Sequence, residues 1–127
     1  MSGLVLKLGP NERILVNGAV IENGDRRSRL SIKTPNANIL RLRDAIRPED
    51  ATTPLRRACL AIQMVLSGES DPSEVRQANL RQIEELDRIL PDIESLEVLT
   101  EAVDALKRDN HYQCLKHLRS LLSKESG

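Results

Sequence analysis

The chain has 127 residues, with 19 lysines and arginines, 19 aspartates and glutamates, and a single aromatic residue, Tyr112. This length fits one compact domain, or a small β module joined to a helical one, and it is sufficient to bury a core. The balanced charge gives no reason to expect long-range attraction of the whole molecule to nucleic acid or anionic lipid. The lone aromatic residue excludes the base-stacking platform of an RRM-type RNA-binding domain.

Charge is unevenly distributed along the chain. Between Arg13 and Arg47 there are eight basic residues and three acidic ones, and the remainder compensates with acid. Such an excess can mark an anion-binding half or only a solvated surface. No leader pattern opens the chain, and no apolar stretch is long enough to span a bilayer, so we expect a cytoplasmic protein with no membrane partner.

The first part of the chain has the pattern of short antiparallel strands. Leu4, Leu6 and Leu8 alternate with other residues, which is typical of a strand with one buried side. The pairs Asn17-Gly18 and Asn23-Gly24 tolerate the positive φ of type I′ turns, so each predicts a hairpin, although the first pair could instead mark a bulge. We therefore expect a tight β-meander.

Two basic runs follow these turns. In Arg29–Lys33 and Ile39–Arg43, apolar residues alternate with positions that carry most of the basic side chains. If the two runs pair antiparallel, Leu40 and Leu42 point inward and four cations share one exposed face: Arg29, Lys33, Arg41 and Arg43. Arg26 and Arg27 adjoin them at the turn. Like charges opposite one another repel, and a bound anion would relieve that repulsion.

The rest of the chain predicts helices. Thr53 and Pro54 open a helix that Gly68 ends, and because this helix is apolar all round we expect it to be buried between the sheet and the later helices. Further helices are expected to end at about Leu90, Asn110 and Lys124. The predicted fold class is therefore α+β: an antiparallel β-meander of about four to five strands over residues 1–47, packed on a bundle of about four helices over residues 48–127.

Catalytic and metal-binding signatures are missing from the sequence. No Gly-Lys-Ser/Thr follows Gly18 or Gly24, so these glycines do not form a phosphate loop. His111 and His117 are not spaced as metal ligands on one helix face, and the two cysteines form no Cys-x-x-Cys pair. We therefore expect no enzyme, no metal site and no cofactor.

The basic strand face is the candidate site. Arginine binds phosphate through two parallel hydrogen bonds and stacks on bases, which suits single-stranded RNA. The candidate RNA contacts are Arg26, Arg27, Arg29, Lys33, Arg41 and Arg43. A protein-binding β module or a solvated face would explain the same pattern.

Other notable residues have more local explanations. Turn geometry accounts for Asn17, Gly18, Asn23 and Gly24. Arg56 and Arg57 lie at a helix start, where the dipole disfavours cations. They are candidates for a secondary contact, or they form salt bridges with neighbours such as Glu49 or Asp50.

Four segments, in order along the chain, carry a resemblance to a known family: Asn17–Arg27 (NGAVIENGDRR), Ile39–Arg41, Thr53–Arg57 (TPLRR) and Tyr112–Arg119 (YQCLKHLR). The chain resembles the flagellar biosynthesis repressor FlbT family over nearly its whole length. The resemblance implies a bacterial post-transcriptional regulator that binds the 5′ untranslated region of flagellin mRNA and represses translation or promotes decay. It also implies a functional partner, FlaF, that acts in the opposite sense.

The sequence leaves two functions open. The first is an mRNA-binding repressor whose basic β face grips the flagellin leader. The alternative is a protein-interaction adaptor or chaperone-like factor in flagellar assembly, which acts through FlaF, flagellin or secretion components without direct RNA contact. Homo-oligomerisation through leftover apolar helix surface also stays open.

Overall fold

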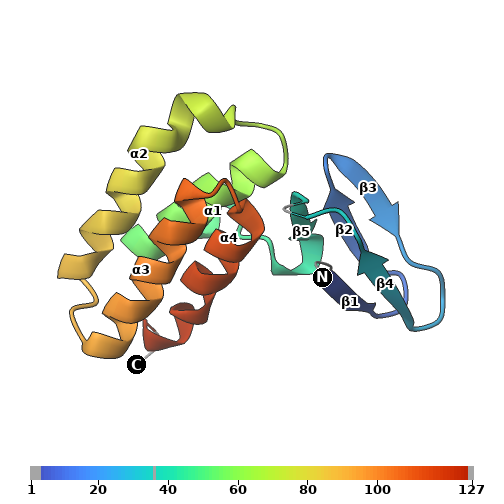
Figure 1. Ribbon diagram of the computed structural model, residues 1–127. Helices are drawn as coiled ribbons and strands as arrows, with labels where there is room; N and C mark the ends of the chain where they lie inside the picture. Colours follow the sequence, from blue (N-terminus) through green and yellow to red (C-terminus); the bar gives the residue numbers. More distant parts are fainter. Residues whose placement is uncertain (1–3, 36, 126–127) are drawn as a thin grey trace.

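The computed structural model describes residues 4–35 and 37–125, with the strands at one end of the molecule and the helices at the other (Figure 1). The strands are β1 (Leu4–Leu8), β2 (Arg13–Val16), β3 (Ala19–Glu22), β4 (Ser28–Ile32) and β5 (Ile39–Arg41). The helices are α1 (Pro54–Leu66), α2 (Pro72–Glu85), α3 (Ile93–Lys107) and α4 (His111–Ser120). This arrangement confirms the predicted α+β fold class.

The five strands form two small antiparallel sheets. One sheet pairs β1 with β4, and the other has the order β3-β2-β5. Asn17 and Gly18 join β2 to β3 with φ values of 49° and 84°, so this turn is the predicted hairpin and not a bulge. The hairpin predicted at Asn23-Gly24 is wrong, because β3 and β4 belong to different sheets.

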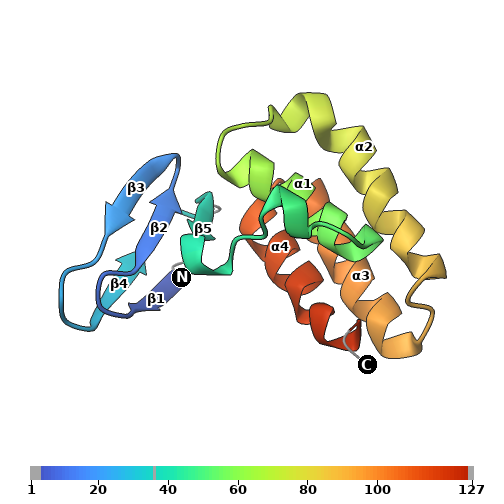
Figure 2. The same cartoon turned by 180° about the vertical axis from the view of Figure 1, so that it is seen from behind.

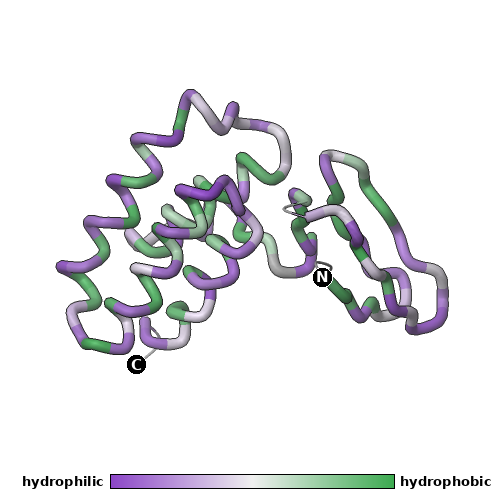
Figure 3. The backbone as a smooth tube through the Cα atoms, in the orientation of Figure 1, coloured by the Kyte–Doolittle hydropathy of each residue, from purple (hydrophilic) through white to green (hydrophobic). Residues whose placement is uncertain are grey.

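Asn23 instead fixes the chain where it crosses between the sheets. Its side-chain amide donates to the carbonyl oxygens of Gly9 (2.7 Å) and Arg26 (2.9 Å), and its Oδ1 accepts from the Ser28 hydroxyl at 2.6 Å. The crossing loop is predominantly hydrophilic (Figure 3). The second Asn-Gly pair is therefore explained by side-chain hydrogen bonds and not by a positive φ at Gly24.

Strand β5 lies nearest to the helices (Figure 2), and apolar residues of β2 and β5 pack on both faces of their sheet. On one face, Ile14 and Ile39 pack with the leucines of β1, as alternation in β1 predicted. On the other face, Leu15 and Leu40 contact the core of the helical bundle. Strand alternation thus supplies two apolar layers, one on each side of β2 and β5.

Strand β5 is shorter than predicted. It ends at Arg41, and Leu42–Asp44 form a 3-10 turn. Leu40 is buried as expected, but Leu42 is 37% exposed, so the inward position predicted for Leu42 is wrong. Successive side chains alternate between the two faces only within a strand, and β5 ends at Arg41, one residue before Leu42.

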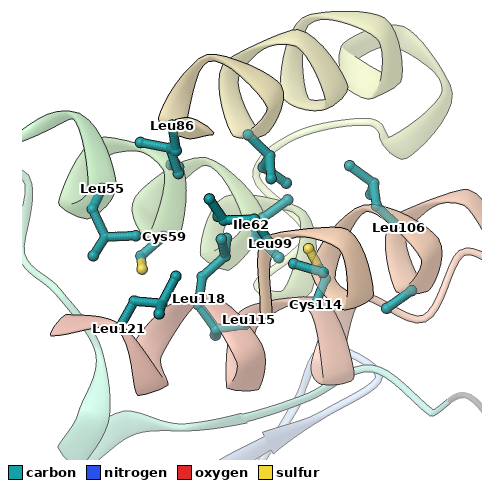
Figure 4. Close-up of a cluster of buried hydrophobic side chains, with 14 of the residues drawn as sticks. Leu55, Cys59, Ile62, Leu86, Leu99, Leu106, Cys114, Leu115, Leu118 and Leu121 are labelled. Atoms are coloured by element: carbon teal, nitrogen blue, oxygen red, sulfur yellow. The ribbon is translucent and has the colours of Figure 1, made fainter. Parts of the chain in front are cut away.

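The helices surround a core to which all four contribute (Figure 4). In α1, the Thr53 hydroxyl accepts from the Arg56 N–H at 3.1 Å and Gly68 has a φ of 84°, which confirms both predicted ends of this buried helix. Cys59 and Cys114 are free and buried, and burial raises the pKa of both thiols to about 12. Within the described ranges, no helix combines the length and apolarity needed to cross a membrane.

The connector between β5 and α1 is held by a buried side chain. Gln63 Oε1 accepts from the Ile46 N–H at 2.7 Å, and Gln63 Nε2 donates to the Ile46 carbonyl at 2.9 Å. Both residues are buried, so these two bonds satisfy backbone groups that water does not reach. The pair fixes the path of the chain from the strands to the helices.

Replacing Gln63 by leucine should lower the free energy of unfolding by about 1–3 kcal/mol, because the buried Ile46 N–H and C=O lose their partners. Urea denaturation followed by circular dichroism measures this loss. The matched control is Gln77→Leu, at an exposed position of α2, where we expect a change within about 0.5 kcal/mol. Equal losses in the two variants would contradict the role given to Gln63.

Candidate nucleic-acid interface

A basic groove opens beside β1 and the start of β4. It encloses about 550 Å³ and is lined by Lys7, Leu8, Gly9, Pro10, Arg27, Ser28, Arg29 and Arg43. Half of these residues are cations, and none is acidic. We call this set the basic groove.

The strand register places two cations directly across from each other. Lys7 pairs with Arg29, and because Leu6 and Leu30 point into the core, Lys7 and Arg29 point outward. Like charges at opposed positions destabilise a sheet. Neither side chain has an acidic partner among the residues the structure describes. A bound polyanion would remove this repulsion.

The structure brings only part of the predicted basic set into the groove. Arg27, Arg29 and Arg43 line it, whereas Arg26 and Lys33 are exposed outside it. The predicted pairing of the two basic runs is wrong, since β4 pairs with β1 and β5 pairs with β2. Leu6 and Leu8 of β1 pack in the same apolar cluster as Leu30 and Ile32 of β4.

Arg41 has a structural role that the sequence did not suggest. Its Nε and Nη2 donate to the Glu12 carboxylate at 2.8 and 2.9 Å, and the Gly9 N–H donates to the same carboxylate at 3.0 Å. Arg41 Nη2 also donates to the Lys7 carbonyl at 2.6 Å. This pair therefore ties β5 to β1 and to the turn that follows it.

These contacts lower the pKa of the Glu12 carboxyl group. The hydrogen bond from Arg41 lowers the pKa of Glu12 to about 2, from an ordinary value of 4.5, even though burial acts in the opposite direction. Arg43 Nε lies 3.5 Å from the same carboxylate, but the Arg43 side chain is 59% exposed and also lines the basic groove. The Glu12 charge thus offsets Arg41 first and Arg43 in part.

Arg56 and Arg57 lie at the start of α1 and do not line the basic groove. Arg56 Nε is 3.5 Å from Glu125 Oε1, so it has a salt bridge, although not with the neighbours expected. Glu49 and Asp50 pair with Arg47 instead. The secondary RNA contact proposed for Arg56 and Arg57 therefore gains no support from their position.

Lys7 is the cation of the basic groove that the sequence analysis did not include among the candidate contacts. It precedes the basic stretch and looks like an ordinary outward residue of the first strand. Only the pairing of β1 with β4 places it beside Arg29. Among the described residues, no three histidine, cysteine or acidic side chains lie together as a metal ion would require.

The fold and the basic groove define a small α+β protein with a localised cationic surface. Comparison with known proteins identifies the group. Over residues 4–127 the sequence matches the family described as "Flagellar protein FlbT". The chain belongs to the FlbT family, which is a family of repressors and not of enzymes.

Named relatives agree with this assignment. The chain is 33% identical to the "Probable flagellum biosynthesis repressor protein FlbT" of Caulobacter sp. (strain K31), over 96% of this chain and 92% of that protein. It is 32% identical to the "Probable flagellum biosynthesis repressor protein FlbT 1" of Bradyrhizobium diazoefficiens, over 96% of this chain and 82% of that protein. The "Flagellum biosynthesis repressor protein FlbT" of Caulobacter vibrioides is 40% identical over 49% of this chain and 43% of its own length. No solved structure matches.

Replacing Glu12 by alanine should lower the free energy of unfolding at neutral pH by about 3 kcal/mol, because a buried ion pair loses one member. The folded-state pKa of Glu12 is about 2 and its ordinary value is 4.5, so its contribution is complete above 4.5 and disappears as the pH falls toward 2. Urea denaturation at a series of pH values should show the gap between the two proteins closing across that window.

Glu22→Ala is the matched control, because the Arg13–Glu22 pair has both side chains more than half exposed. We expect it to lose less than about 1 kcal/mol. A Glu12→Ala loss no larger than the Glu22→Ala loss would show that the buried pair does not hold the sheets together.

Proposed function

We propose that the protein represses flagellin synthesis post-transcriptionally by binding the 5′ untranslated region of flagellin mRNA in the basic groove. The observation that carries the proposal is the opposed pair Lys7 and Arg29, beside Arg27, in a hollow with no acidic residue in its lining. The relatives named as flagellum biosynthesis repressors support the regulatory part. Blocked translation or faster decay of the message would follow from occupancy of the leader.

Phosphate binding is the main chemistry that the groove offers. The guanidinium groups of Arg27 and Arg29 can each make two parallel hydrogen bonds to a phosphate, and Lys7 adds a point charge. Ser28, which lies between the two arginines in the sequence, also lines the hollow, and its hydroxyl donates to Asn23. Base contacts must come from arginine planes and backbone groups, because Tyr112 is the only aromatic residue of the chain and lies on α4.

The zero net charge of the chain is compatible with RNA binding. Local potential depends on where charges lie, and a hollow lined by one sign of charge concentrates counter-ions. The acidic excess of the helical part would repel RNA and so orient it toward the strands. Affinity should then be moderate and strongly dependent on salt.

The alternative function is a protein-interaction adaptor that acts with a FlaF-type partner, flagellin or secretion components. The observation that favours it is β3, an edge strand whose four residues are all exposed, with Val20 62% exposed. An exposed apolar edge is a template for another chain. The two functions differ in salt dependence, because apolar burial is far less sensitive to salt than phosphate binding.

A triple variant, Lys7→Ala, Arg27→Ala and Arg29→Ala, tests RNA binding in the groove without removing Arg41. Titration of a flagellin leader at several salt concentrations, with and without FlaF, should show weaker binding by the variant. The slope of log affinity against log salt should fall by about 2, since each lost phosphate contact on a single strand removes about 0.7.

The matched control removes three exposed cations from the helical part, with the changes Arg81→Ala, Arg88→Ala and Lys107→Ala. It should bind the leader as the unchanged protein does. Absence of binding by the unchanged protein in both conditions would eliminate direct RNA recognition, and equal binding by the groove variant would place the RNA elsewhere.

A further inference from the structure

Strand β3 leaves one edge of the three-stranded sheet open. In the described ranges it pairs only with β2, at the end of the order β3-β2-β5. All four of its residues are exposed, and even Ile21, on the face that carries Ile14, is 38% exposed. The sheet runs from β5, beside the helices, to β3, away from them (Figure 1, Figure 2). A neighbouring chain can therefore approach this edge without meeting the helical part.

The backbone groups at this edge are available for pairing. The Asn23 N–H donates to the Glu12 carbonyl oxygen at 2.8 Å, so the backbone of Asn23 faces β2. Because bonding alternates along an antiparallel pair, Ile21 also bonds to β2, whereas the N–H and C=O of Val20 and Glu22 point away from it. Among the described residues, none is hydrogen-bonded to these outward groups. The edge thus presents free donors and free acceptors.

Strand β3 lacks the residues that usually keep an edge strand from pairing. Natural edge strands are protected by proline, by lysine, by bulges or by inward-pointing charges. Ala19–Glu22 contains no proline and no lysine, and its register with β2 is continuous. Its one charged side chain, Glu22, lies 2.7 Å from Arg13, so the edge carries no net charge. An added strand would meet neither a blocking residue nor an unpaired charge.

The pattern of β3 is complementary to itself. In an antiparallel pair centred on Ile21, Val20 of one copy lies opposite Glu22 of the other. Each such pair exchanges two main-chain hydrogen bonds, which uses all the outward groups of both residues. Ile21 then meets its own counterpart across the twofold axis. Because Ile21 shares a face with Ile14, which packs with the leucines of β1, the contact extends that apolar layer from one copy into the next.

Charge also favours a second copy as the occupant. The formal net charge of the chain is zero, so two copies do not repel each other at long range. At the edge, each Glu22 brings its own Arg13, and two juxtaposed edges are therefore neutral. The cations of the basic groove are not part of the contact, because no residue of β2 or β3 lines that groove.

We propose that the protein forms a symmetric homodimer by antiparallel pairing of two β3 edges, with the twofold axis beside Ile21. The two three-stranded sheets then join into one sheet of order β5-β2-β3-β3-β2-β5. The contact is isologous, because the same residues of both copies form it. The dimer does not depend on the RNA binding proposed for the basic groove. It occupies the edge that a partner protein would need under the alternative function.

Sedimentation velocity over a range of protein concentrations measures the dimer, and hydrogen exchange locates it. The Val20 and Glu22 amides should exchange rapidly in dilute solution and gain protection as the concentration rises, because their N–H groups bond only to the second copy. The Ile21 amide bonds to β2 within one copy, so its exchange should change much less.

Charge substitutions at Val20 test the register. Val20→Glu sets a carboxylate opposite Glu22 of the other copy and should weaken the dimer about tenfold, whereas Val20→Lys sets a cation there and should weaken it less. The matched control is Val5→Glu, at an exposed valine of β1 in the other sheet, which should leave the dimer unchanged. Circular dichroism checks that each variant is folded.

Several results would overturn the proposal. They are a monomer at every concentration, a dimer that Val20→Glu leaves intact or that Val5→Glu weakens equally, and a dimer that leaves the Val20 amide unprotected. Equal weakening by Val20→Glu and Val20→Lys would contradict pairing centred on Ile21. Protection of Val20 only when a partner protein is added would assign the edge to that partner instead. The triple variant of the basic groove should still dimerise, so lost RNA binding with a retained dimer would defeat the proposed function alone.

Discussion

The Glu12 carboxylate is the contact on which the strand half of the molecule depends. It lies in the turn after β1, accepts the Gly9 N–H, and holds Arg41 of β5 against the Lys7 carbonyl. A two-stranded sheet is at best marginally stable alone, so the sheet of β1 and β4 depends on its packing against the three-stranded sheet. Apolar burial supplies most of that packing energy but little direction. A buried pair with fixed hydrogen-bond geometry can position one sheet against the other.

The same pair determines which cations remain for a ligand. A count of charges that starts at Arg13 omits Glu12, so the basic stretch looks more uniformly available than it is. Glu12 takes Arg41 out of the candidate set and partly offsets Arg43. What remains is concentrated at Lys7, Arg27 and Arg29. The buried Glu12 carboxylate thus reduces the cations available to a ligand to a smaller set, which is concentrated in the basic groove.

Short-range sequence signals predicted much of the fold, whereas the pairing of strands that are distant in the sequence could not be predicted from them. Asn17-Gly18 sets the turn of a hairpin and Thr53-Pro54 caps a helix, and both act within a few residues. The hairpin of β2 and β3 and the start of α1 could therefore be predicted from the sequence. Alternation predicted the buried side of each of the strands β1 and β4, but it does not choose a partner strand. The pairing of Lys7 with Arg29 joins residues far apart in the chain. The sequence therefore predicted the arginines of the basic groove but not the lysine that lies beside them.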